Sequence, residues 1–233
     1  MASLDSVLTR QVLAKGVVRQ VMEDTAIGIR LRYIGAGTVT TVAATQATSI
    51  VLTTSTNTDT YLFSSYATMG ALVDAINSDG RFEAKIVDAL RSENPDDFFI
   101  TSAGVTAGTD NNGNVVWDLL IDTSASLTQT VCLSPLAPDF DLPKGHRVHL
   151  QEIFYNVDNT AAADGLTVWK RKGSTETELF HSLNVDATDT TITFASGHGK
   201  ITVGPDEEIL VQVDGTVTTV PTGNIIRVVG LYE

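Results

Sequence analysis

Cysteine is almost absent from this sequence, which holds one, Cys132, among its 233 residues. A single thiol cannot form a disulfide within the chain, so covalent cross-links do not stabilise the fold. Cys132 lies among apolar residues and is expected to be a small buried side chain without a redox role. The chain must therefore gain its stability from its core or from assembly with other chains.

Long apolar runs are absent too. A membrane helix needs about 20 consecutive apolar residues, and no run in the sequence approaches that length. The first residues include Asp5 and lack the apolar segment of a secretion signal. We therefore expect a protein that is made and folded in the cytoplasm and that has no membrane partner.

Basic residues are scarce relative to acidic ones. The chain has 15 Lys and Arg against 28 Asp and Glu, which gives a formal net charge of -13. A field of this sign repels phosphate groups, so we expect no nucleic-acid partner. Residues 1–32 are the exception, because five basic groups there outnumber three acidic ones and leave a local charge of +2.

Proline is sparse, and three of the six prolines fall within residues 134–145. Proline has no N–H donor and holds the preceding residue extended, so Pro135, Pro138 and Pro143 exclude a helix or a central strand there. We expect this stretch to be a linker between two domains. The predicted division is an N-terminal arm or first strands at 1–32, a domain at 33–133, the linker at 134–145 and a second domain at 146–233.

The residues before the linker predict an α+β domain. Apolar and β-branched residues alternate with polar ones over residues 27–33 and recur in Thr-rich runs up to residue 63, which is typical of antiparallel strands. A helix is expected after Thr68, which can cap its first turn, because apolar residues follow at the spacing of one helical face. These residues are Met69, Leu72, Val73 and Ile76.

The rest of this domain is less uniform. Residues 82–90 fit a strand or a second helix, and the strand is favoured slightly. Residues 98–101 and 115–121 are predicted to be strands on either side of a turn at Asn112 and Gly113. We therefore expect a sheet with one or two short helices.

After the linker the helical pattern disappears. Seven short strands separated by turn residues are predicted, at 146–156, 166–171, 177–185, 190–195, 200–203, 208–213 and 225–232. This density of short strands is typical of an antiparallel β-sandwich of the jelly-roll or immunoglobulin-like kind. The predicted fold class of the chain is therefore mainly β.

Several residue patterns resemble metal-binding or catalytic motifs, but their spacing does not fit such sites. His146 and His149 are three residues apart in a predicted strand, so their side chains point to opposite faces. The polar run at 110–114 places its glycine wrongly for a calcium loop. Adjacent acids such as Asp96 and Asp97 are ordinary in exposed turns. We expect no enzymatic activity, no catalytic residue, no metal and no cofactor.

One alternative from another class stays open. Trp117, Tyr155, Trp169 and Phe180 could line a sugar groove on a β-sandwich, although packing in a core or an interface is the favoured use of these rings. A carbohydrate-binding module or a glycosidase is therefore the rival interpretation.

The N-terminal segment is the predicted partner-binding region. Its apolar residues follow neither a helical nor a strand period consistently, and leaving nine such side chains in water would be costly. We expect an attachment arm whose apolar anchors and basic groups contact an acidic partner. The residues are Leu4, Val7, Leu8, Arg10, Val12, Leu13, Lys15 and Arg19. The alternative is a strand and a helix that belong to the first domain.

Two stretches carry a resemblance to a class of proteins. Residues 59–63 followed by 68–77 look like the strand-then-helix module of phage capsid-decoration and tail proteins. Residues 146–233 look like the projecting β-sandwich of such proteins. Together with the Thr-, Ala- and Gly-rich composition, they make the chain resemble the structural proteins of tailed bacteriophage virions.

The resemblance implies a non-enzymatic virion protein, first of all a capsid decoration (cement) protein that binds the outside of the head and stabilises it. The implied partners are the major capsid protein or other virion proteins. A tail, neck or fibre component is the first alternative. We also expect a homo-oligomer, with a trimer as the predicted state, because strand edges need covering and shells offer threefold positions.

Overall fold

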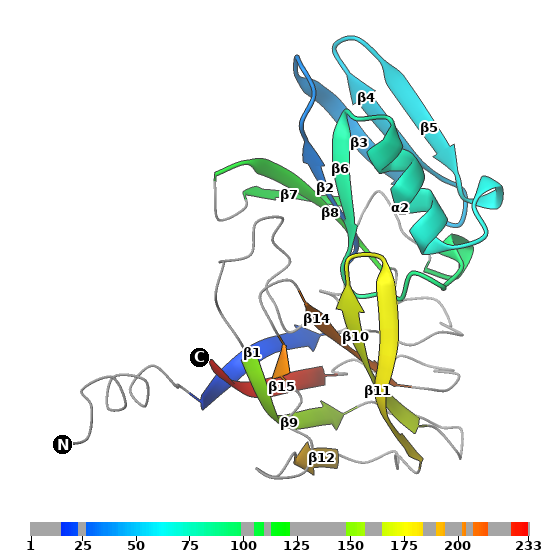
Figure 1. Cartoon of the computed structure of the whole chain (residues 1–233). Coiled ribbons are helices and arrows are strands. Elements are labelled where there is room, and N and C mark those ends of the chain that lie inside the picture. Colours follow the sequence, from blue (N-terminus) through cyan, green and yellow to red (C-terminus); the bar gives the residue numbers. More distant parts are fainter. Residues whose placement is uncertain are drawn as a thin grey trace.

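The computed structural model describes residues 15–22, 27–98, 105–109, 113–121, 148–156, 165–183, 190–193, 202–203, 207–213 and 225–232. Within these ranges the chain forms four antiparallel sheets and one α-helix, which confirms the predicted mainly β class. Figure 1 shows two of the sheets, with the helix, above the other two. We call these pairs the N-terminal sheets and the C-terminal sheets.

The first N-terminal sheet has the strand order β6-β2-β8-β7, with β6 at Phe82–Ile86, β2 at Ile27–Tyr33, β8 at Val115–Leu120 and β7 at Val105–Thr109. Residues directly opposite in antiparallel strands share a face. Leu31 stands between Ala84 and Trp117, and Ile29 stands between Ile86 and Leu119. This face is therefore apolar, and Ile29, Leu31 and Leu119 have no exposed surface.

The second N-terminal sheet has the order β3-β4-β5, with β3 at Val39–Thr45, β4 at Ser49–Thr54 and β5 at Thr58–Leu62. Ile50 and Leu52 of its central strand have no exposed surface, while Val51 and Thr53, which alternate with them, face outward and are half-buried. The alternation of buried and exposed residues that predicted these strands is confirmed.

The predicted helix is α2, Met69–Ser78. Thr68 caps its first turn, because the Thr68 Oγ1 accepts a hydrogen bond from the Ala71 N–H at 3.1 Å. Its buried side chains are the four that the sequence predicted, and the chain leaves the helix through Gly80, whose φ of 69° favours glycine. At ten residues it is the longest helix in the described ranges, and none there could cross a membrane.

Replacing the capping residue tests the start of α2. We expect Thr68→Ala to lower the free energy of unfolding by about 1 kcal/mol, because the Ala71 N–H loses its acceptor. Chemical denaturation measures the change. Ser78→Ala removes an exposed hydroxyl at the other end of the helix, which donates to the Ala75 carbonyl, and should change stability by less than about 0.5 kcal/mol. Equal losses in the two variants would contradict a specific capping role.

Two further expectations for this region have different outcomes. The favoured strand at 82–90 is confirmed over residues 82–86 as β6, whereas residues 87–90 form a loop. The predicted strand at 98–101 is wrong at its first residue, because Phe98 ends the 3-10 helix η3, Pro95–Phe98, and residues 99–101 lie outside the described ranges. The Asp96 N–H bonds to the Asn94 side chain at 3.0 Å, a turn that competes with extended backbone. The strand opposite β8 is β7 instead.

The C-terminal sheets contain a strand in each of the seven predicted ranges. One sheet has the order β1-β15-β9-β12, with β13 also paired to β9, and the other has the order β11-β10-β14. The strands are β1 at Lys15–Met22, β9 at Val148–Asn156, β10 at Gly165–Lys172, β11 at Thr175–Leu183, β12 at Thr190–Thr193, β13 at Thr202–Val203, β14 at Glu208–Val213 and β15 at Ile225–Tyr232.

The predicted N-terminal segment, residues 1–32, is divided between the two pairs of sheets. Strand β1 runs antiparallel to β15, at the other end of the sequence, whereas β2 is a central strand of an N-terminal sheet. The predicted boundary between residues 32 and 33 falls inside β2. The N-terminal sheets thus lie, in sequence, between β1 and β9 of one C-terminal sheet. The predicted linker at 134–145 lies outside the described residues.

Candidate functional site

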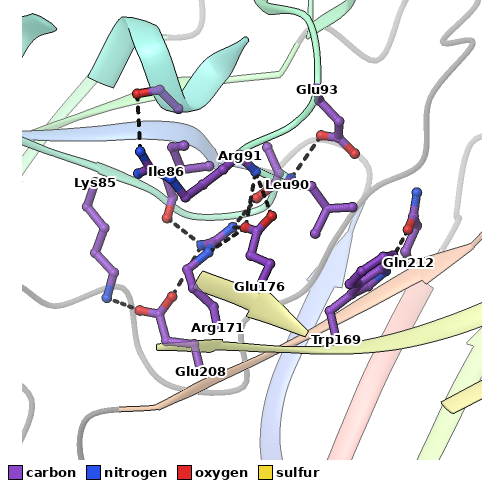
Figure 2. A network of polar contacts seen from close by, with 12 residues as sticks. Lys85, Ile86, Leu90, Arg91, Glu93, Trp169, Arg171, Glu176, Glu208 and Gln212 are labelled. Atoms are coloured by element: carbon purple, nitrogen blue, oxygen red, sulfur yellow. Dashed lines mark hydrogen bonds and ion pairs between the residues drawn. The ribbon is translucent and has the colours of Figure 1, made fainter. Parts of the chain in front are cut away.

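Buried charged side chains gather where the N-terminal sheets meet the C-terminal sheets (Figure 2). Lys85 comes from β6, Arg171 from β10, Glu176 from β11 and Glu208 from β14. We call these four residues and the loop of residues 87–93 the arginine junction. Arg171, Glu208 and Glu93 are each less than a tenth exposed, so these charged side chains lie in the interior of the protein.

Arg171 is the centre of the junction. Its Nε donates to Glu176 Oε1 at 2.8 Å, and its Nη1 donates to Glu208 Oε2 at 3.2 Å. Nη1 also donates to the Ile86 carbonyl at 3.0 Å, and Nη2 donates to the Ala89 carbonyl. The planar guanidinium offers donors in fixed directions. Arg171 therefore binds two carboxylates of its own sheet and two backbone carbonyls of the N-terminal part.

Strand register explains how the sequence places both carboxylates. Arg171 is directly opposite Glu176 across the β10–β11 pair and directly opposite Glu208 across the β10–β14 pair. Opposed residues in antiparallel strands share a face, so the arginine lies between two carboxylates. The turn from β10 to β11 passes through Gly173, whose φ of 59° is left-handed, and so sets the first pairing.

Both glutamates reach across to the N-terminal part as well. The Arg91 N–H lies 3.0 Å from each carboxylate oxygen of Glu176. Lys85 forms an ion pair with Glu208. Figure 2 shows these contacts converging on Arg171. Two cations and two carboxylates thus neutralise one another, as buried charges require.

The loop of residues 87–93 is itself fixed to the N-terminal sheets. The Val87 N–H donates to the Gly28 carbonyl at 3.1 Å, and the Ile27 N–H donates to Asp88 Oδ2 at 2.8 Å. Within the loop, the Leu90 N–H donates to Glu93 Oε2 at 2.9 Å. A contact that fixes the position of this loop therefore also fixes the position of β2.

The loop is also tied to the start of α2. The Gly70 N–H donates to the Arg91 carbonyl at 2.9 Å, and the Arg91 side chain pairs with Asp74 at 2.6 Å. A Cβ at Gly70 would lie 3.1 Å from that carbonyl oxygen, which explains a glycine inside the helix. The junction is in this way connected to the helix.

An apolar contact lies beside the charges. Leu90 of the loop packs against Leu210 of β14, and both are buried. Trp169 covers the pair and donates from its Nε1 to Gln212 Oε1 at 2.7 Å. The junction therefore combines shape and charge complementarity, and its geometry fixes two parts of the chain relative to each other.

The sequence-predicted site residues lie elsewhere. Lys15 and Arg19 are in β1, opposite Leu231 and Val228 of β15. The other six lie outside the described residues, so the partner-binding role of this segment stays a prediction. Sequence reasoning missed the arginine junction. Its signal is that Arg171 lies two residues before, and Glu176 two residues after, the turn at Gly173 and Ser174.

Two of the four rings considered for a sugar groove are described by the structure, and both pack against other side chains. Trp117 contacts Phe82 with ring centroids 6.5 Å apart, on the apolar face of its sheet. Trp169 packs at the junction. The side chains of Tyr155 and Phe180 are outside the described set. Among the side chains that are described, no three His, Cys, Asp or Glu residues form a group that could hold a metal.

A second polar group connects β5 to the end of α2. The Tyr61 hydroxyl donates to Asp79, and Arg81 pairs with Asp59 at 2.7 Å. Burial, followed by the hydrogen bond to Asp79, raises the pKa of Tyr61 above the ordinary value of tyrosine. The folded state thus favours the neutral phenol.

This raised pKa predicts a loss of stability at high pH. The stabilisation is fully present below the ordinary tyrosine pKa of about 10 and is lost as the pH rises above it. Urea denaturation between about pH 8 and 11 should show a decline for the parent chain. The decline should be shallower in Tyr61→Phe, whereas the control Tyr66→Phe should follow the parent. Identical slopes in the parent and Tyr61→Phe would refute the expectation.

No protein-family model matches the chain, and no curated protein sequence matches it. The function must therefore be inferred from the residues and their arrangement.

Proposed function

We propose that the chain is a non-enzymatic structural protein of a tailed bacteriophage virion. Its role is that of a capsid decoration (cement) protein, which binds the outer surface of the head and stabilises it. Its partners are the major capsid protein and further copies of itself. The observation that carries the proposal is the arginine junction, which uses buried charge to fix the position of one part of the chain against another.

Fixed geometry is what a component of a shell needs. A buried ion pair adds little stability compared with apolar packing, because removing the charges from water is costly. It does penalise any arrangement in which the charges separate. Sliding of the N-terminal part against this sheet would separate Lys85 from Glu208 and would remove the Ile86 and Ala89 carbonyls from Arg171. The junction therefore supports a rigid building block, whose role is mechanical.

The charge of the chain supports a position outside the head. A net charge of -13 opposes contact with packaged DNA. The exterior of the particle carries no such penalty, so the sign of the charge favours a decoration protein over an internal one.

In this proposal the C-terminal sheets form an antiparallel β-sandwich of the jelly-roll or immunoglobulin-like kind. The chain alternates between the two sheets, since β9 lies in one, β10 and β11 in the other, β12 and β13 again in the first, and β14 and β15 one in each. Repeated crossing between two antiparallel sheets is typical of sandwiches.

The proposal is tested on purified particles. We expect an antibody against this chain to label heads, and we expect heads stripped of the chain to rebind the pure protein and to withstand higher temperatures afterwards. Labelling of the tail alone would favour a tail, neck or fibre component. Absence of the chain from purified particles, together with glycan binding or polysaccharide hydrolysis, would overturn the proposal in favour of the carbohydrate-binding rival.

A truncation separates attachment from folding. We expect a variant lacking residues 1–14 to keep its melting temperature and lose binding to stripped heads, because β1 and its pairing with β15 remain. A variant lacking residues 1–22 also loses β1 and should melt at a lower temperature. Thermal unfolding and co-sedimentation with heads measure the two effects. Full binding by the shorter truncation would refute the role of Leu4, Val7, Leu8, Arg10, Val12 and Leu13.

A further inference from the structure

Strand β5 has a free edge. It lies at the end of its sheet and pairs with β4 only, in the part of the chain that the structure describes. Figure 1 shows it at the margin of the N-terminal sheets. Its outward-facing side chains, Thr58, Thr60 and Leu62, are all exposed, with Leu62 at 47%.

The hydrogen bonds at the two ends of the β4–β5 pair show which backbone groups point outward. The Thr54 N–H donates to the Asn57 carbonyl at one end, and the Phe63 N–H donates to the Thr48 carbonyl at the other. Hydrogen-bonded pairs alternate along an antiparallel ladder. The N–H and C=O groups of Asp59 and Tyr61 therefore point toward β4, and those of Thr58 and Thr60 point away from the sheet.

The edge lacks the features that usually prevent strands from pairing. Edge strands are commonly protected by charged residues, proline or a bulge. The β4–β5 ladder is regular, whereas β3 at the opposite edge carries a bulge between Val39 and Thr41. The one charge on β5, Asp59, is neutralised by Arg81. Neither edge strand contains proline, but β5 also lacks the bulge that interrupts β3.

The stretch of sequence that leads to this strand is uncharged. No Asp, Glu, Lys, Arg or His occurs between Arg32 and Asp59, although 18% of the chain is charged. On the outer face of the sheet, the uncharged side chains of Thr53 and Thr58 contact each other through their hydroxyls. A second copy of a chain with net charge -13 meets least repulsion at such a surface.

We propose that two copies of this chain associate through β5, antiparallel and two-fold symmetric about Thr60. Thr60 then stands opposite the partner's Thr60, and the two exchange both backbone hydrogen bonds. The Leu62 N–H donates to the carbonyl of the partner's Thr58. The pairing places no like charges opposite each other, and it joins the two sheets into one continuous sheet.

The sequence of β5 suits this two-fold arrangement. Opposed β-branched residues stabilise antiparallel pairs, and the centre of the contact is a Thr–Thr pair. An isologous contact needs only one surface, which closed homo-oligomers commonly use. The ladder is short, so the dimer should form in a concentration-dependent equilibrium. The inference is independent of the proposed function and of the expected trimer, which would need another surface.

Disulfide trapping tests the register. In a Cys132→Ser background, two copies of Thr60→Cys would have opposed Cα atoms about 5.5 Å apart, within the range that a disulfide spans. Copper–phenanthroline oxidation should convert most of this variant to a covalent dimer. Thr58→Cys alone should not cross-link, because its copies are about 13 Å apart. Mixing Thr58→Cys with Leu62→Cys should restore cross-linking. Equal yields from all variants, or none from Thr60→Cys, would overturn the proposal.

A second variant tests association without cross-linking. Light scattering of the parent chain should approach twice its mass of 24.8 kDa as concentration rises. Thr60→Lys should keep the monomer mass, because it sets two positive charges opposite each other. Thr45→Lys adds the same charge at an exposed position of β3 and should dimerise like the parent. A parent that remains monomeric, or a Thr60→Lys variant that dimerises equally well, would contradict the pairing.

Discussion

Arg171→Ala should lower the free energy of unfolding by about 3–5 kcal/mol. The substitution leaves Glu176 and Glu208 with buried negative charge and removes the donors of the Ile86 and Ala89 carbonyls. Urea denaturation followed by circular dichroism measures the loss. Arg91→Ala is the matched control, because its ion-pair partner Asp74 is 64% exposed in its side chain and such pairs contribute at most about 1 kcal/mol.

The same variant should also uncouple the two parts of the chain. The chain has two tryptophans, and Trp117 lies in the N-terminal sheets whereas Trp169 lies beside the junction in the C-terminal sheets. Single-tryptophan versions, Trp117→Phe and Trp169→Phe, therefore report on each part separately. We expect one shared transition in the parent and two separate midpoints with Arg171→Ala.

A double-mutant cycle separates charge from packing. Adding Glu208→Gln to Arg171→Ala should cost less than the sum of the two single changes, because one of the unpaired charges is gone. Additive losses, or equal losses in Arg171→Ala and Arg91→Ala, would show that the junction does not act as a buried charge network.

Phe82→Ala should be the most damaging change in the N-terminal sheets, at about 3–5 kcal/mol. Phe82 is 2% exposed and lies between Tyr33 and Trp117, with ring centroids 5.1 Å and 6.5 Å away. Removing the ring opens a buried cavity and costs both aromatic contacts. The measurement is urea denaturation followed by Trp117 fluorescence.

Two controls define this effect. Phe82→Leu retains most of the buried volume and should cost clearly less than the alanine variant. Val115→Ala changes a side chain of the same sheet that is 52% exposed and should stay within about 0.5 kcal/mol of the parent. If Phe82→Leu proved as destabilising as Phe82→Ala, the loss would not be due to the cavity.

The sequence predicted those elements whose signals are local. Thr68 and the apolar spacing that follows it identify α2, and the alternation around Ile50 identifies β4, because each pattern lies within a few residues. The strand expected at Phe98 failed for a local reason as well. Pro95 and the Asn94 side chain favour a 3-10 turn over extended backbone.

The arginine junction could not be predicted in the same way. Glu208 is 37 positions from Arg171, and Ala89 is 82 positions away, so their contacts depend on strand register and on how the sheets meet. Periodicity within a strand carries no information on either. Only the Arg171–Glu176 pair, close to one turn, had a signal that could have been read from the sequence.

The pairing of β1 with β15 has a consequence for the order of events during synthesis. The first described strand finds its partner only when the last one, Ile225–Tyr232, has left the ribosome. The N-terminal sheets, whose strands all lie between residues 27 and 120, can form much earlier. A ribosome stalled after residue 120 has cleared the exit tunnel, but before β15 is made, should therefore carry a protease-resistant intermediate that still leaves β1 exposed. Closure of the β1–β15 pair is then a late step with long-range contacts, which folds slowly compared with local structure.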